Sequence, residues 1–170
     1  MPASSETGAP PLACRQHDHD HCIDTALEAA RQRCHINGAR LTELREQVLR
    51  LIWQSHKPLG AYTLMDMLSE QSTKRIAPPT VYRALDFLLE QQLIHRIHSL
   101  NAFIGCSHPD EGHPNNFFIC QSCGVAIEFN NDHFQAAISA TAAQSGFSVT
   151  SQTVELVGLC ITCEEARGHE

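Results

Sequence analysis

The sequence predicts an α+β protein made of two small domains. Residues 24–105 carry apolar residues at helical spacing followed by two β-prone runs, whereas residues 106–170 read as strand, strand, helix and strand. Two C-x-x-C pairs also lie in the second segment, one early and one near its end. A chain of 170 residues is long enough for one ordinary domain or two small ones, and the change of pattern favours two.

Residues 1–23 are expected to form a disordered, His-containing tail. They are rich in Pro, Ser, Gly and Ala and run into HDHDHC, which holds His17, His19, His21 and Cys22. Such a tract can pick up metal ions, but without a scaffold to fix its geometry it would bind them weakly and unselectively. The stretch lacks the basic start and apolar core of a secretory signal, so we expect a cytoplasmic protein.

Four amphipathic helices are expected in the domain at 24–105. Asp24 or Thr25 caps the first, Thr42 caps the second, and Pro78-Pro79-Thr80 opens the fourth. The expected helices cover about residues 24–36, 43–56, 61–70 and 79–91. Their apolar stripes, which we expect to be buried, consist of Leu27, Ala30, Cys34, Leu44, Val48, Leu51, Ile52, Leu64, Met65, Leu68, Val81, Leu85, Leu88 and Leu89.

Two β-prone runs follow the helices and meet at the turn-favouring Asn101. They are LIHRIHSL and NAFIGC, and they predict a hairpin laid against the helices. Helices closed by a hairpin are typical of a winged helix-turn-helix, in which the helix at 79–91 would be the recognition helix. Tyr82 and Arg83 lie in its first turn, and Arg suits bidentate contact with guanine, while the Thr80 hydroxyl could bind a phosphate.

The second domain, residues 106–170, is expected to be a small α/β module. FFICQSC and GVAIEF predict two strands joined by a metal-binding turn, a helix follows over about residues 132–143, and FSVTSQTVELVGLC predicts one long strand. A sheet this small needs more burial than it can find alone, so we expect it to pair with a second copy of the chain.

Potential metal ligands are concentrated between Cys106 and Glu128. Two C-x-x-C turns, at Cys120 and Cys123 and at Cys160 and Cys163, could together make an all-thiolate zinc site. Four thiolates saturate such an ion. The remaining donors of the segment, which are Cys106, His108, His113 and Glu128, are therefore surplus and suggest a second site of mixed ligands.

The net charge of −7 is unevenly distributed along the chain. Residues 24–105 hold ten Lys and Arg against eight Asp and Glu, whereas residues 106–170 hold one Arg against eight acids. A more basic first half beside an acidic, metal-rich second half is expected when only one domain meets a polyanion. No apolar run approaches the ~18 residues that indicate a membrane span, so no membrane partner is expected.

The helix PPTVYRALDFLLEQ, together with the turns FICQSCG and GLCITC, resembles the Fur superfamily of bacterial metalloregulators, and within it the zinc uptake regulator (Zur) branch. The resemblance covers about residues 25–165. It implies a homodimeric repressor with an N-terminal winged helix, a C-terminal dimerisation domain, a structural zinc and a regulatory zinc at the hinge. Operator DNA would be bound when the regulatory site is filled, and zinc uptake and homeostasis genes would be the targets.

The resemblance also assigns individual residues. The structural zinc ligands would be Cys120, Cys123, Cys160 and Cys163, and the regulatory ligands would be His95, Cys106, His113 and Glu128. It thus implies two zinc ions per chain. Tyr62 and Arg83 match positions that touch bases in this family.

One departure bears on the metal. The iron-responsive branch carries an H-H-x-H type cluster ahead of its first C-x-x-C, whereas this chain reads CSHPDEGHPNNFFIC, with a thiolate at Cys106. Sulfur ligands favour zinc over iron and manganese. His98 and His108 lie near the proposed ligands, and we expect ordinary surface roles for both. The alternative is a member of the superfamily that responds to another metal or to redox state.

Other classes fit the sequence less well. A purely structural zinc protein would need only the four-cysteine set. A zinc deaminase would need His-x-Glu before Pro-Cys-x-x-Cys, but neither His108 nor His113 has Glu two positions later, and no Pro precedes Cys120. Redox chemistry at C-x-x-C would require a thioredoxin-like βαβ context. We therefore expect no enzymatic activity and no small-molecule substrate.

Overall fold

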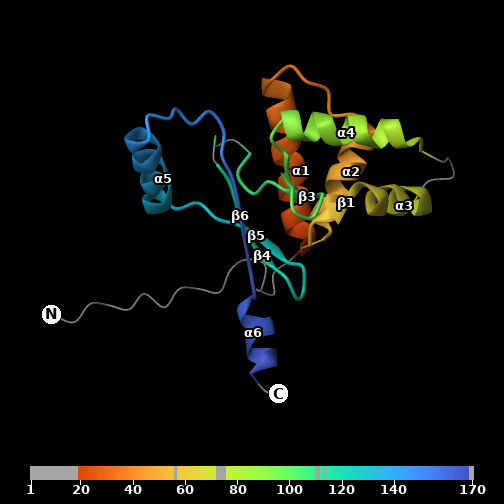
Figure 1. Ribbon diagram of the computed structural model, residues 1–170. Helices are drawn as coiled ribbons and strands as arrows, with labels where there is room; N and C mark the ends of the chain where they lie inside the picture. Colours follow the sequence, from red (N-terminus) through yellow and green to blue (C-terminus); the bar gives the residue numbers. More distant parts are fainter. Residues whose placement is uncertain (1–18, 56, 72–75, 110–111, 113, 169–170) are drawn as a thin grey trace.

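The computed structural model describes residues 19–55, 57–71, 76–109, 112 and 114–168 (Figure 1). The elements are α1 (His19–Ile36), α2 (Glu43–Trp53), β1 (Leu59–Gly60), α3 (Ala61–Gln71), α4 (Pro78–Glu90), β2 (Ile94–Ile97), β3 (Ala102–Gly105), β4 (Asn115–Cys120), β5 (Ala126–Glu128), α5 (Asp132–Gln144), β6 (Thr153–Gly158) and α6 (Ile161–Arg167). In the part of the chain described, no helix combines the length and apolar character needed to cross a membrane.

Helices α1 to α4 and a small antiparallel sheet form the N-terminal half. Strands β2 and β3 make the predicted hairpin, hereafter the wing, and β1 pairs with the other edge of β3. This arrangement confirms the winged helix-turn-helix. The predicted apolar stripes form its core, although Leu44, Met65 and Leu89 are only partly buried. Strand β1 was not predicted, because two residues are too few to show an alternating pattern.

The first helix begins earlier than the sequence analysis predicted. It starts at His19, inside the segment expected to be a disordered tail, and the cap expected at Asp24 or Thr25 is wrong. Instead, the Thr25 hydroxyl donates to the His21 carbonyl one turn upstream. Ile23 is buried in the helical core next to the stripe that Leu27 continues, so the helix must extend upstream to bury it.

The C-terminal half is a three-stranded sheet in the order β5-β4-β6 with two helices. Strand β4 pairs antiparallel with β5 and parallel with β6. The long strand predicted over 147–160 is shorter, because the six residues of β4 pair one to one with Thr153–Gly158 and leave residues 147–152 without a partner strand. The short helix α6 was not predicted. In Figure 1, α5 and the N-terminal helices lie on opposite sides of β6.

A second apolar cluster joins the two halves. Ile97 of the wing is fully buried together with Phe117, Ile119 and Ala126 of the C-terminal sheet, and Ile104 packs against them. The wing therefore lies directly against the sheet.

Candidate metal centres

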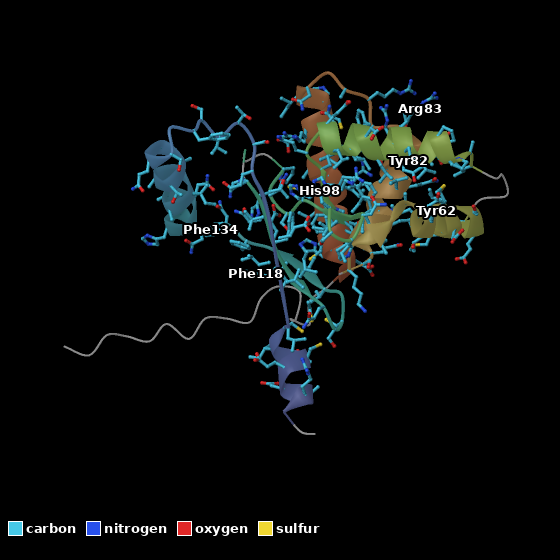
Figure 2. The ribbon with its side chains drawn as sticks, in the orientation of Figure 1. Tyr62, Tyr82, Arg83, His98, Phe118 and Phe134 are labelled. Atoms are coloured by element: carbon cyan, nitrogen blue, oxygen red, sulfur yellow. The ribbon has the colours of Figure 1, made fainter. Side chains whose placement is uncertain are left out.

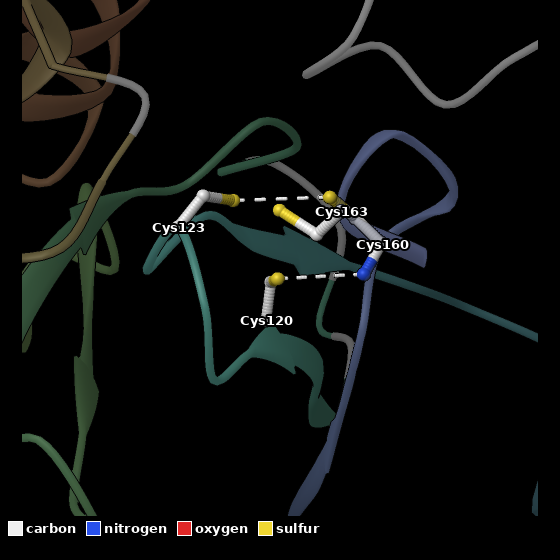
Figure 3. Close-up of side chains that lie close together, drawn as sticks. All are labelled: Cys120, Cys123, Cys160 and Cys163. Atoms are coloured by element: carbon white, nitrogen blue, oxygen red, sulfur yellow. Dashed lines mark hydrogen bonds between the residues drawn. The ribbon is translucent and has the colours of Figure 1, made fainter. Parts of the chain in front are cut away.

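Four cysteine side chains converge at one end of the C-terminal sheet (Figure 3). The Sγ atoms of Cys120, Cys123, Cys160 and Cys163 all lie within 4.8 Å of one another. The Cys123 and Cys160 sulfurs are 3.8 Å apart. Two thiolates at about 2.3 Å from one tetrahedral zinc ion would be separated by roughly 3.8 Å. The spacing therefore fits a four-cysteine zinc site.

The local backbone explains why these cysteines meet. Cys120 ends β4, and the following turn is closed by a hydrogen bond from the Gly124 amide to the Cys120 carbonyl at 2.9 Å. Gly124 has a φ of +75°, a conformation that favours glycine. Because β6 runs parallel to β4, it ends beside Cys120, where Cys160 precedes α6 and Cys163 lies in its first turn. The motif thus follows from strand direction.

Hydrogen bonds prepare one sulfur for metal binding. The pKa of Cys120 is lowered to about 6, chiefly by a hydrogen bond from the Cys123 backbone and next by one from the Cys160 backbone. The Cys160 amide lies 3.4 Å from the Cys120 sulfur. For Cys163, a hydrogen bond with Ser122 lowers the pKa, but contacts with the other thiols and burial outweigh it and raise the pKa to about 11. The lowered pKa of Cys120 favours its thiolate, which is the form that binds zinc, whereas the raised pKa of Cys163 favours its thiol in the absence of metal.

A second cluster lies where the wing meets the C-terminal sheet. His95 of β2, Cys106 after β3 and Glu128 at the end of β5 offer ligand atoms within 4.8 Å of one another. All three side chains are largely buried, and His95 Nε2 is 3.1 Å from Glu128 Oε1. Nitrogen and oxygen ligands at about 2.1 Å from one tetrahedral zinc ion would lie roughly 3.4 Å apart. A cysteine sulfur, an imidazole nitrogen and a carboxylate oxygen thus meet in a geometry compatible with zinc.

Other donors predicted near this cluster are distributed differently. His113, the fourth predicted ligand, lies outside the described residues. His98 and His108 are exposed, and neither belongs to the groups of ligand atoms found among the described residues. From the predicted tail, His21 and Cys22 line a cavity of about 520 Å³ together with Cys106 and Glu128.

Cys34 is buried, as expected, and burial raises the pKa of its thiol.

The residue before Cys106 is tightly packed against α2. Gly105, the last residue of β3, faces the indole of Trp53 so closely that a Cβ there would lie 2.5 Å from Cε2. The Cys106 amide donates to the Leu93 carbonyl at 3.0 Å, which holds the residue at the end of the wing. This glycine–tryptophan contact could not be predicted from the sequence, because its two residues are far apart in the chain.

The predicted DNA-contacting residues lie on an exposed end of the helical half. Thr80, Tyr82 and Arg83 are exposed in the first turns of α4, and Tyr62 of α3 is 77% exposed. Figure 2 places Tyr62, Tyr82 and Arg83 at the end of the domain away from α5.

Residues 36–157 match the Ferric uptake regulator family, and the chain belongs to this family. Within it, the chain is similar to the zinc uptake regulation protein of Escherichia coli (strain K12), with 38% identity over 140 residues that cover 82% of this chain and 81% of the relative. It therefore lies in the zinc uptake branch of the family.

Solved structures give the same result. A zinc uptake regulator complexed with zinc and DNA superimposes with a TM-score of 0.80 at 36% identity, covering 86% of this chain and 97% of the other. The holo form of XcZur gives a TM-score of 0.74 at 40% identity, covering 84% of this chain and 99% of its own. The apo form gives 0.52, with 85% of this chain and 99% of its own covered. The structure of this chain is therefore more similar to the holo form than to the apo form.

Proposed function

We propose that this protein is a zinc-responsive transcriptional repressor that binds operator DNA as a homodimer and controls zinc uptake and homeostasis genes. One observation carries the proposal: a single cluster of potential metal ligands joins the wing, the segment after β3 and the C-terminal sheet through His95, Cys106 and Glu128. Metal binding at a site formed by both halves can change the orientation of one half relative to the other. The similarity to a regulator solved with zinc and DNA supports this role.

The two clusters take different parts in this proposal. The four-cysteine cluster lies within the C-terminal half and would hold a structural zinc ion. The mixed cluster, completed by His113, would hold the regulatory zinc ion, which gives two ions per chain. Bound zinc supplies a divalent centre that takes four ligands at fixed distances and angles. Residues 24–105 would form the DNA-binding domain, residues 106–170 the metal-binding dimerisation domain and residues 1–23 a His-containing tail.

The chain's own residues would transmit the signal through the wing. Fixing the His95 imidazole against the Glu128 carboxylate holds β2 on the C-terminal sheet, and Cys106 holds the end of β3 there. With these side chains held, the two recognition helices of a dimer keep one separation, as half-sites about one helical turn apart require. With them released, only a fraction of molecules is competent, and the apparent affinity for DNA falls by that fraction.

Operator recognition would use the exposed end of α3 and α4. Arg83 and Tyr62 would reach the edges of DNA bases. Thr80 and Tyr82 would contact the DNA phosphate backbone or neighbouring bases. The helix α4 begins with prolines and has no acidic residue in its first turn, so its N-terminal end favours phosphate.

Dimerisation would use the C-terminal half. Helix α5 has no buried residue, and the large apolar side chains of Phe118, Phe147, Val157 and Ile161 are exposed. Apolar surface of this kind marks an interface, and a second copy of the chain would cover it.

The rival proposal within the family is a response to another metal or to redox state. Cys106 is buried within the mixed cluster, and a sulfur ligand there would favour zinc, because oxygen and imidazole sets suit iron and manganese better. We propose no enzymatic activity, since both cysteine-containing clusters are accounted for as metal sites, and a cytoplasmic location, where operator DNA lies.

A Cys106→Ser variant tests the proposal. Loss of the regulatory thiolate should abolish zinc-dependent operator binding, while the four-cysteine site, the fold and the dimer persist. Operator affinity measured against free zinc, together with native mass spectrometry, separates these properties. A Cys106→Ser dimer that responds to zinc like the parent would contradict the proposed sensor site and direct the search to the HDHDHC segment.

A further inference from the structure

The turn of the wing makes a second contact with the C-terminal sheet, separate from the candidate regulatory metal cluster. Glu155 of β6 accepts hydrogen bonds from two successive backbone amides of this turn. Its Oε1 atom is 2.6 Å from the His98 nitrogen, and its Oε2 atom is 3.0 Å from the Ser99 nitrogen. Both carboxylate oxygens are thus used by the same turn. Charge-assisted bonds of this kind are stronger than bonds between neutral groups.

Strand register places this contact in line with the metal cluster. Phe117 of β4 pairs with Glu128 on one side and with Glu155 on the other. Residues paired in register point to the same face of a sheet. One row across the sheet therefore presents Glu128, Phe117 and Glu155 to the wing.

Each member of this row contacts a different part of the wing. Glu128 lies against His95 at 3.1 Å. Phe117 lies edge-on to the His95 ring, with 5.5 Å between ring centroids, and packs with Ile97. Glu155 holds the amides of the turn. The wing is thus held at both ends of the row, with an apolar contact between them.

Attachment at two points has a mechanical consequence. A wing held only at His95 and Cys106 could pivot about that point, and the recognition helix would pivot with it. The contact at Glu155 removes this freedom without contributing a ligand. The environment of Glu155 favours the ionised carboxylate. Burial raises its pKa, but hydrogen bonds from Ser99 and His98 outweigh burial and lower the pKa overall.

We propose that Glu155 is a positioning residue that orients the wing on the C-terminal sheet. Both operator binding and zinc affinity at the regulatory site would then depend on it. This inference rests on the proposed function. It also goes beyond it, because Glu155 binds neither metal nor DNA in this scheme and acts only on the relative orientation of the two halves.

Thermodynamic linkage sets the expected size of the effect. If Glu155 favours the orientation in which the regulatory ligands converge, its removal lowers the population of that orientation, and every ligand that needs it binds more weakly by the same factor. Two hydrogen bonds to a partly exposed carboxylate correspond to a factor of about ten. The four-cysteine site and the dimer should be unaffected.

The test compares Glu155→Gln with Glu165→Gln, which removes the same charge from an exposed position on α6. The DNA is a duplex selected from a random pool by the zinc-loaded parent. For Glu155→Gln we expect about tenfold weaker binding of this duplex and of zinc at the exchangeable site, with one tight zinc ion retained per chain. Glu165→Gln should behave like the parent.

Hydrogen exchange provides a readout that a general loss of stability would not produce. In the zinc-loaded Glu155→Gln protein, the amides of His98 and Ser99 should exchange faster, while those in the core of α2 keep their protection. Faster exchange throughout the chain would instead show a merely structural residue and overturn the proposal. Parent-like zinc and DNA affinities would also overturn it.

Two further outcomes are distinguishable. If Glu155→Gln does not fold, Glu155→Asp keeps the charge but shortens its reach, so an intermediate loss of both affinities is expected, and parent-like values would reject the role. If the parent itself shows no zinc-dependent binding to any duplex, the proposed function fails. Unchanged exchange at His98 and Ser99 in the variant would then reject the contact independently.

Discussion

Arg83 shows how much depends on a single exposed side chain. It lies in the first helical turns of α4, on the surface and away from the C-terminal half. Core residues of the same helix, such as Val81 and Leu85, are fully buried and determine how the helix packs. The direction in which Arg83 points is therefore set by its buried neighbours, while its guanidinium stays available for a partner.

Replacing Arg83 by Ala should reduce sequence-specific DNA binding. A bidentate arginine–guanine contact contributes about 1 to 3 kcal/mol of discrimination, so affinity for the operator should fall by that amount and the preference over scrambled DNA should flatten. Competition binding on both duplexes measures this. Lys74 and Arg75, which lie outside the described residues, serve as controls: their loss should weaken both duplexes alike and reduce the salt dependence. An equal loss on both duplexes for Arg83→Ala would show a phosphate contact only.

The wing is the element that contributes both to the candidate metal cluster and to the contact with Glu155. Its strand β2 carries His95, its strand β3 ends beside Cys106, and its turn contacts Glu155. The position of β3 depends on close packing between Gly105 and Trp53 of α2. A change at this point should therefore be felt at the metal cluster.

Gly105→Ala should move the end of the wing. The added Cβ would overlap the Trp53 ring, and overpacking of this kind costs about 1 to 3 kcal/mol of folding free energy. Because Cys106 is the next residue, zinc affinity at the regulatory site should fall as well. Gly60→Ala in β1 of the same sheet is the matched control, since a Cβ there has nothing within 4 Å. Denaturant unfolding and zinc titration are the measurements; a Gly105→Ala protein equal to the control in both would exclude this packing constraint.

The elements also show which features the sequence predicts and which it does not. Helices α1 to α5 were predicted to within a few residues, apart from the start of α1 and the end of α2, because apolar spacing reflects the local period of the backbone. Residues 147–152 have strand-like composition but no partner, which only the pairing of β4 with β6 reveals. Helix α6 begins between Cys160 and Cys163. It was not predicted, because this C-x-x-C spacing was interpreted as a metal-binding turn.

Site residues follow the same division. Spacing within C-x-x-C identifies the four cysteines, since the turn alone brings two thiolates together. Resemblance assigned His95, Cys106 and Glu128, whose ligand atoms the structure brings within 4.8 Å of one another. Glu155 had no signal, because one acid in a β-prone run is ordinary, and its position opposite the wing depends on the register of three strands.

At the scale of the whole molecule, the two candidate metal sites differ in what they hold together. The four-cysteine cluster joins β4 to the start of α6 within one half, whereas the mixed cluster joins one half to the other. Folding free energy and zinc binding are inseparable at a site of the first kind. A site of the second kind can empty while each half stays folded.

Cys120→Ser should therefore abolish the dimer or the solubility of the protein. Three thiolates cannot complete the tetrahedral site, and the sheet loses the constraint between β4 and β6. Size-exclusion chromatography and zinc content per chain measure this outcome, with Cys34→Ser as a control, since Cys34 lies in the helical core and belongs to neither cluster. A Cys120→Ser protein that remains a folded, zinc-responsive dimer would remove the structural role from this site.

Coupling between the two halves should be reciprocal. If zinc at the mixed site and operator DNA both favour the arrangement in which the wing lies on the sheet, then operator DNA must tighten zinc at that site by the same factor by which zinc tightens DNA. Zinc titrations with and without a saturating operator duplex, and DNA titrations at low and high free zinc, give the two factors independently. The four-cysteine site should show no such dependence, because it lies within one half. Factors close to one in both titrations would mean that zinc at the mixed site and operator DNA are not coupled, and would contradict a switch that acts through the arrangement of the wing on the sheet.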